Sequence, residues 1–484
     1  MIDLAAVIGA LALLIYFAFR GITVILLAPV MALLAVFLTG GLPILASYTQ
    51  IFMVSTGGFI VSFFPLFMLG AIFGKLMDDS GSAASIAQGV SRRLGPQRAI
   101  ISVVLCCGLL TYGGVSAFVV AFAIYPVAAA LFQTADIPKR LIPGTLALGA
   151  FTFTMTALPG TPSIQNAIPM PFFGTTVFAA PVLGTIAAAV MLVLGILWLE
   201  RRARKARTAG EGYGSYDDSV PKADVVMREH SQGKGFDIIE LQEEECHRAS
   251  YPSVALAVLP VIVVIVTNYV FLKLIVPQID TSFLEQPRFG ATTIESVRGL
   301  WAVIVALFSA ILVLISSNWN RLTDLRASLD KGTDASVLPI FNTASLVGFG
   351  AVVAALPVFD LLSKALLSIA GGNPLTSVAL SVTALSAITG SASGGMSIAL
   401  DVLGSIYVEL AQDAGVSLAA MHRITSVASG ALDALPHNGA VITLLSVCGL
   451  SHRESYLDIA VVAVAFPLVA LLTILLLASI FGTF

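Results

Sequence analysis

Charged residues are scarce in this chain of 484 residues: Asp, Glu, Lys and Arg together make up 11%, against 57% hydrophobic residues. Soluble domains carry roughly 25% charged residues, so the composition excludes an ordinary soluble globular protein. The mean hydropathy is +0.96. Apolar runs long enough to cross about 30 Å of hydrocarbon as helices recur along the sequence. The composition therefore predicts an all-α polytopic membrane protein.

Four further features are missing. The four cysteines are too few and too scattered for a disulfide framework, and we expect free thiols. No glycine-rich loop is followed by Lys and Ser or Thr, which argues against an ATP-driven process within this chain. His230, Cys246 and His247 lack the spacing of a metal site, so we expect no metal and no cofactor. The first apolar run lacks a basic leader and a small-residue cleavage site, and we expect a retained span.

Ten apolar runs predict membrane spans, five in each half of the chain. They cover residues 3–19, 21–40, 52–76, 142–170 and 176–199, and then 252–272, 299–317, 337–357, 421–450 and 455–482. Two further apolar stretches, 99–132 and 374–410, are interrupted at their midpoints by Gly and Ser. Their arms of about 12 to 16 residues are shorter than the roughly 20 that a span needs. We expect re-entrant hairpins, and the alternative is two full spans joined by a tight turn.

A short sequence unit occurs twice. Ala157-Leu158-Pro159-Gly160 is followed 277 residues later by Ala434-Leu435-Pro436-His437, and the same shift lays residues 113–116 over residues 390–393. Proline removes a backbone donor and clashes with the preceding turn, so each Leu-Pro unit should break its helix. Two breaks at matching places in two halves are typical of a transporter's binding site.

Five spans per half is an odd number, so the second half should enter the membrane upside down relative to the first. Residues 1–199 would form the first inverted repeat, 200–250 a partly disordered polar linker, and 251–484 the second repeat. With the N-terminus outside, twenty of the 25 Lys and Arg fall in cytoplasmic segments. We therefore expect both termini outside and the linker in the cytoplasm.

Small residues and hydroxyls gather at the two hairpin tips. Glycine lets backbone approach a ligand closely, and a helix that begins after the tip points free N–H groups and its positive dipole end at that ligand. The alternative is that these residues only allow tight helix packing. The tip residues predicted to bind an organic anion are Gly113, Gly114, Ser116, Thr389, Ser391, Ser393 and Gly394.

Polar side chains also mark the two breaks. The second break adds Asp433 and His437, four residues apart, and ionisable groups inside a span are functional candidates by default. Histidine titrates near neutral pH, so we hypothesise that His437, with Asp433, carries a coupling proton. The alternative is a hydrogen-bonded pair with no role in transport. The break residues predicted to bind substrate are Thr156, Thr161, Ser163, Gln165, Asn166 and Asn438.

Other ionisable residues are interpreted as interfacial because they fall near span ends. This group includes Glu409, His422 and Arg423. Asp401 lies on the second arm of the 374–410 hairpin, where we expect it to face water or to pair with Arg423.

Four segments resemble the gluconate:proton symporters (GntP-type permeases), and the chain looks closest to their 3-hydroxybutyrate permease branch. They read Phe-Gly-Lys-Leu-Met-Asp-Asp-Ser-Gly at 73–81, Tyr-Gly-Gly-Val-Ser at 112–116, Ile-Pro-Lys-Arg-Leu-Ile-Pro-Gly at 137–144 and Ala-Leu-Pro-Gly-Thr-Pro-Ser-Ile-Gln-Asn at 157–166. The resemblance implies an inverted-repeat fold of the ion-transporter type and proton-coupled uptake of small hydroxy acids across a bacterial inner membrane. It also implies a homodimer in which a hairpin-bearing domain moves like an elevator. Gluconate-type members carry His-Pro-Gly where this chain has Pro159-Gly160-Thr161, which favours a smaller, less hydroxylated acid.

Three alternatives stay open. Hydroxyls and carbonyls freed at the breaks could coordinate Na⁺ in place of proton coupling. A channel would also account for the spans. Ser393, His437 and Asp433 supply the residue types of a hydrolase triad, but the tip serines do not have the G-x-S-x-G spacing. We therefore predict a secondary active transporter and not an enzyme, with the lipid bilayer as its environment and no nucleic-acid partner.

Overall fold

The computed structural model describes residues 2–20, 22–214, 251–359, 372–436 and 438–482, and within these ranges the chain forms helices and no strand. Seven of the described helices are long and apolar enough to cross a membrane, or eight if the bent pair 82–112 counts as one span. The prediction of an all-α polytopic membrane protein is confirmed.

The described part of the first half contains twelve α-helices. They are α1 (Ile2–Phe19), α2 (Val24–Thr39), α3 (Ile44–Ala46), α4 (Met53–Asp79), α5 (Ser82–Leu94), α6 (Ala99–Tyr112), α7 (Ala117–Thr134), α8 (Ile142–Ala150), α9 (Phe153–Thr156), α10 (Ile164–Ala167), α11 (Pro169–Phe173) and α12 (Pro181–Thr208). A π-helical turn, Ser47–Phe52, joins α3 to α4. α12 continues to Thr208, nine residues beyond the predicted end of its span.

The described part of the second half contains nine helices. They are α15 (Val254–Val270), α16 (Ile294–Ser317), α17 (Leu325–Ala355), α19 (Pro374–Thr389), α20 (Ala392–Asp413), α21 (Leu418–Ser429), α22 (Gly439–Val447), α23 (His452–Ala460) and α24 (Phe466–Phe481). The first residues of α19, α20, α21 and α22 lie within two residues of those of α6, α7, α8 and α10 shifted by 277. The spacing of the two Leu-Pro units thus recurs in the helix boundaries, whereas the inversion of one half stays a prediction.

The long helices α4 and α17 pack against each other at the centre of the molecule. Two glycines of α17 permit the close approach, because a Cβ on Gly348 would lie 2.4 Å from Thr56 Oγ1 and one on Gly332 would lie 2.8 Å from the Ile72 Cα. Small residues at helix contacts are characteristic of membrane proteins, where backbone proximity supplies van der Waals packing.

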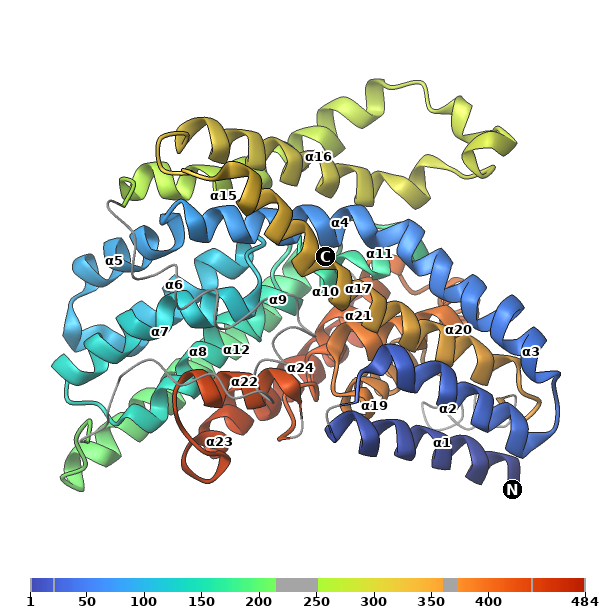
Figure 1. Ribbon diagram of the computed structural model, residues 1–484, viewed down its shortest axis with the longest axis horizontal. Coiled ribbons are helices and arrows are strands. Elements are labelled where there is room, and N and C mark those ends of the chain that lie inside the picture. The colour runs from blue at the N-terminus through green and yellow to red at the C-terminus, as the bar shows by residue number, and fades with distance from the viewer. Residues whose placement is uncertain (1, 21, 215–250, 360–371, 437, 483–484) are drawn as a thin grey trace.

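Two helical hairpins lie on opposite sides of the short central helices α9, α10 and α21, as Figure 1 shows. The first consists of α6 and α7 and follows a 107° bend after α5. The second consists of α19 and α20, and it packs against α17. α20 has 22 residues and is long enough to cross a membrane by itself, so the re-entrant course of residues 374–410 stays a prediction.

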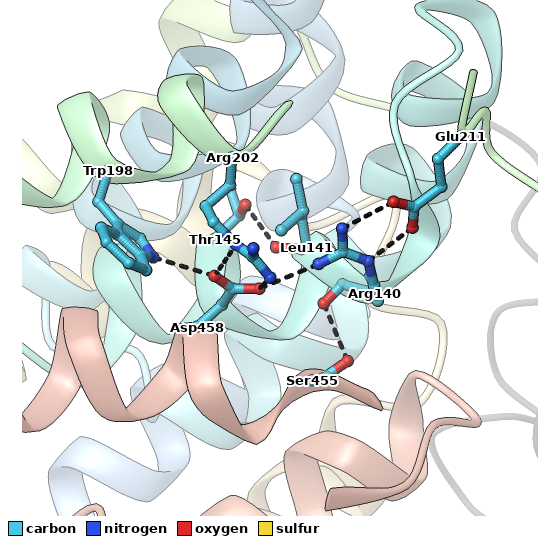
Figure 2. A network of polar contacts seen from close by, with 8 residues as sticks. All are labelled: Arg140, Leu141, Thr145, Trp198, Arg202, Glu211, Ser455 and Asp458. Atoms are coloured by element: carbon cyan, nitrogen blue, oxygen red, sulfur yellow. Dashed lines mark hydrogen bonds and ion pairs between the residues drawn. The ribbon is translucent and has the colours of Figure 1, made fainter. Parts of the chain in front are cut away.

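A cluster of charged residues joins the two halves where α23 packs against α8 (Figure 2). Asp458 of α23, with a side chain only 1% exposed, accepts hydrogen bonds from Arg202 Nε at 2.9 Å and Trp198 Nε1 at 2.9 Å. Arg140 lies 3.5 Å from the same carboxylate and donates to both oxygens of Glu211, at 2.6 and 2.8 Å. The cluster brings together three segments that the charge bias assigns to the cytoplasmic side.

The chain that follows α12 is anchored beside this cluster. Tyr213 is buried, and its backbone N–H donates to Asp136 Oδ1 at 2.9 Å. The Arg140 guanidinium holds the pKa of the Glu211 carboxyl below its usual range. The first residues of the predicted linker are therefore part of the folded structure.

We predict that Asp458→Asn strongly destabilises the protein, because it leaves two arginines without their buried carboxylate. Removing one partner of a buried ion pair costs about 3–5 kcal/mol. Thermal unfolding in detergent at pH 7 measures the loss.

Glu211→Gln is the control for this prediction, because the Glu211 side chain is 42% exposed and a surface pair contributes little. Its depressed pKa means that the pair stabilises the fold above about pH 4.3, the ordinary glutamate value, and that this stabilisation is lost as the pH falls through the folded-state pKa. Equal melting temperatures for Asp458→Asn and Glu211→Gln at pH 7 would contradict the stabilising role assigned to the buried Asp458 carboxylate.

Candidate functional site

Both Leu-Pro units lie where a helix is interrupted. In the first half, α9 ends at Thr156 and α10 begins at Ile164, with Leu158 and Pro159 in the non-helical gap. In the second half, α21 ends at Ser429 and α22 begins at Gly439, with Pro436 in the gap. The local cause is proline, which cannot continue the hydrogen-bond ladder of the preceding turn.

The two breaks lie side by side. Ser426 Oγ donates to the Thr156 carbonyl at 2.8 Å. A Cβ placed on Gly430 would lie 2.7 Å from Thr156 Cγ2, so the start of the second break touches the start of the first. Residues that are about 270 positions apart in the chain thus form one central region, between the hairpins in Figure 1.

The tip of the first hairpin lies against the first break. Gly114 has φ +98, and a Cβ there would lie 2.9 Å from Pro162 Cγ. Tyr112 Oη donates to the Pro159 carbonyl at 2.8 Å. Ser116 precedes α7 without a side-chain capping bond, so the first N–H groups of α7 keep their hydrogen-bonding capacity.

The tip of the second hairpin is capped by its own hydroxyls. Ser391 Oγ accepts from the Gly394 N–H at 3.1 Å and lies 3.4 Å from Ser393 Oγ, while Thr389 Oγ1 donates to the Leu385 carbonyl at 2.8 Å. A Cβ on Gly394 would lie 2.5 Å from Leu346 of α17. Beyond its tip, α20 packs against α10 and α11 of the first break.

Several predicted binding residues hold the breaks together instead of facing outward. Ser163 Oγ donates to the Met155 carbonyl at 2.6 Å, and Thr156 Oγ1 to the Thr152 carbonyl at 3.2 Å. Thr161 Oγ1 accepts from the Ser163 N–H at 3.4 Å. The side chain of Asn438 caps α22 by accepting from Ala440 N–H at 2.7 Å, and its amide nitrogen donates to the Asp433 carbonyl.

Two predicted residues present polar groups without a partner in the described chain. The side chains of Ser116, at the start of α7, and Gln165, in α10, are both partly exposed, and neither forms a hydrogen bond with the described residues. They are the members of the predicted set best placed to meet a ligand. His437 lies outside the described residues, and Asp433 is partly buried in the second break.

His422 and Arg423 are the functional candidates that sequence reasoning missed. The interpretation of both as interfacial is wrong, because each has 0% exposure. Arg423 does not pair with Asp401, which is exposed on α20. Arg423 donates instead to the carbonyls of Ala179, Val177 and Thr156, at 2.9, 3.1 and 3.4 Å. The rule that ionisable residues inside a span are functional by default applied to both residues and would have found them.

The hydrogen bonds of Asn166 define the tautomer of His422. The Asn166 amide nitrogen donates to two carbonyls, Thr161 O at 2.9 Å and Val177 O at 3.0 Å, so its oxygen faces the imidazole. That oxygen lies 3.1 Å from His422 Nε2 and therefore accepts its proton. Thr175 Oγ1, 2.6 Å from Nδ1, then donates to the neutral ring. This network uses both amide hydrogens of Asn166, and it binds α21 to the first break.

We predict that Gly114→Ala impairs substrate binding while the protein still inserts. The new Cβ would strain a backbone at φ +98 and collide with Pro162. This collision would push the hairpin tip away from the break. Gly58→Ala is the matched control, because nothing lies within 4 Å of a Cβ there. Ligand-induced thermal shifts of the two purified variants measure the difference, and equal shifts would contradict the contact.

Comparisons with known proteins agree with a membrane transporter. No known family profile matches the chain. The crystal structure of the YdaH transporter of Alcanivorax borkumensis, described as having an unusual topology, matches with a TM-score of 0.50 over 88% of this chain and 86% of that one. At 15% sequence identity this likeness concerns the fold alone.

A bacterial relative is much more similar in sequence. It is YxjC of Bacillus subtilis (strain 168), named an uncharacterized transporter. The two are 45% identical over 463 residues, which cover 94% of this chain and 95% of the relative. The chain therefore belongs to the same family of multi-pass membrane transporters as YxjC.

Proposed function

We propose that the protein is a secondary active transporter that takes up a small hydroxycarboxylate, 3-hydroxybutyrate-like or gluconate-like, together with protons. The observation that carries the proposal is the meeting of the first hairpin tip with the first break, directly beside the second break. Broken helices that converge in this way form the substrate sites of secondary transporters. The transporter family favours this reading over the intramembrane hydrolase.

The charge of the substrate follows from the groups at the site. The start of α7 carries helix N–H groups, and Ser116 and Gln165 add uncharged donors. Helix N-termini favour negative charge through both the free N–H groups and the helix dipole. An organic anion with one carboxylate suits this set.

The size of the substrate follows from how few polar side chains are left for it. Most predicted hydroxyls and amides are used within the protein, as the bonds of Ser163, Asn166 and Asn438 show. A polyhydroxylated acid would need a partner for each of its hydroxyls. The inventory therefore favours a short acid with few hydroxyls, such as 3-hydroxybutyrate.

Proton coupling is favoured over Na⁺ coupling by the state of the freed carbonyls. Na⁺ needs several oxygens with free lone pairs, and hydrogen bonds from the protein already take up part of the capacity of the carbonyls of Thr156, Pro159, Thr161, Val177 and Ala179. We assign the coupling proton to His437 with Asp433. Alternating access would arise from two inverted repeats, with the hairpin-bearing domain moving like an elevator in a homodimer of the inner membrane.

Uptake by the purified protein in liposomes tests the function. We expect labelled 3-hydroxybutyrate to accumulate when the outside is more acidic than the inside, and a protonophore to abolish the accumulation. A Na⁺ gradient at equal pH should have no effect. Uptake that only equilibrates, whatever the gradient, would identify a channel and sink the proposal.

We predict that Asp433→Asn abolishes accumulation driven by a pH gradient but preserves counterflow exchange, because the substrate site remains while the proton carrier is lost. Asp413→Asn, the same change at an exposed position at the end of α20, serves as the control. Unchanged pH-driven accumulation by Asp433→Asn would show that the coupling proton is carried elsewhere.

A further inference from the structure

Arg423 is the largest of the fully buried side chains, and it has no acidic partner among the described residues. Its four hydrogen bonds all go to backbone carbonyls: Nε and Nη2 to Ala179, at 3.1 and 2.9 Å, Nη2 to Val177 at 3.1 Å and Nη1 to Thr156 at 3.4 Å. Its positive charge is therefore balanced by peptide dipoles within the described chain and not by a carboxylate.

Burying such a charge is unfavourable, since an ion loses several kcal/mol of solvation that dipoles only partly replace. An apolar side chain would fill the space at lower cost but would leave the Ala179 carbonyl without a donor, whereas Thr156 would still accept from Ser426 and Val177 from Asn166. Of the natural side chains, arginine has the planar fork of donors that can reach three acceptors at once. The presence of arginine at this position thus indicates a need for the donor geometry of the guanidinium, for its positive charge, or for both.

The carbonyls that Arg423 binds lie at both edges of the interrupted segment. Thr156 ends α9, where the first break begins, and Val177 and Ala179 belong to the turn between α11 and α12. Gly184 of α12 leaves room for this arrangement, because a Cβ there would lie 3.0 Å from Arg423 Nε and 2.4 Å from the Ala157 carbonyl. Helix α21 of the second half thereby fixes the course of the first-half break.

The same break carries the contacts with the first hairpin tip. Pro159, three residues after Thr156, accepts from Tyr112, and Pro162 touches Gly114. Arg423 thus supports one side of a segment whose other contacts face the proposed substrate site. Thr156, Thr161 and Arg423 are all buried, so the charge acts within a buried region.

We propose that Arg423 is the positioning residue of the first break and the source of the positive potential that makes the site select carboxylates over uncharged analogues. This inference rests on the proposed uptake of a hydroxycarboxylate. Arg423 does not touch the substrate. At an effective dielectric constant of about 20, one charge several ångströms beyond contact changes the affinity for an anion by on the order of tenfold.

Two substitutions separate the charge from the fork. Arg423→Gln removes the charge, and Arg423→Lys keeps the charge but cannot reach three carbonyls. Ser426→Ala is the matched control, because it removes one neutral hydrogen bond to the same Thr156 carbonyl. Each protein is reconstituted in liposomes, and uptake of labelled 3-hydroxybutyrate is competed with unlabelled 3-hydroxybutyrate or its uncharged amide, 3-hydroxybutyramide.

We expect Arg423→Gln to lower the preference for the carboxylate over the amide by about tenfold. Arg423→Lys should keep the preference within about twofold of the unchanged protein while its maximal rate falls, because the break is no longer held at three points. Ser426→Ala should keep the preference, whatever its rate. Gel filtration and thermal unfolding establish that each variant is folded.

An unchanged preference in a folded Arg423→Gln protein would overturn the inference. So would a loss of preference in Arg423→Lys, and this variant decides the matter if the glutamine variant does not fold. If the unchanged protein transports 3-hydroxybutyrate but the Arg423 and Ser426 variants all show the same preference for the carboxylate, only the proposed role of Arg423 is refuted. If the unchanged protein transports no carboxylate, the proposed function is wrong together with the inference that depends on it.

Discussion

Backbone groups freed inside a membrane protein must find partners within the protein, and the centre of this molecule is arranged around that requirement. Pro159 interrupts a helix, and the carbonyls that lose their helical partners accept hydrogen bonds from side chains instead. Tyr112, Asn166, Arg423 and Ser426 supply these donors. Because two of the four come from α21, the break in the first half has its shape only when the second half is in place.

Two buried charged groups of the described chain, Asp458 and Arg423, offset the cost of burial in different ways. Asp458 is shared by Arg140 and Arg202, so opposite charges neutralise one another where three segments meet. At the centre, Arg423 is bound by carbonyl dipoles and keeps its net charge. Charge balance suits a structural joint, whereas a retained charge creates a potential that an anionic ligand can complement.

The fold of this protein says less about its substrate than the residues at the site do. A transporter of 15% identity shares the fold, and a relative of 45% identity shares the family, yet a fold by itself does not specify a substrate. In this chain the distinguishing features are local. They are the open start of α7 after Ser116, the partly exposed Gln165, and the buried pair formed by His422 and Arg423.

The sequence by itself determined the membrane class, the places where helices are interrupted, and the turn between α6 and α7. These features follow from composition and from proline and glycine, which act on their own backbone and need no distant partner. Only the tertiary structure decided which polar groups remain available. Ser163 and Asn166 turn inward, and Arg423 is buried against carbonyls about 245 residues away in the chain, because helix packing selects their hydrogen-bond partners. No local pattern of residues encodes such long-range contacts.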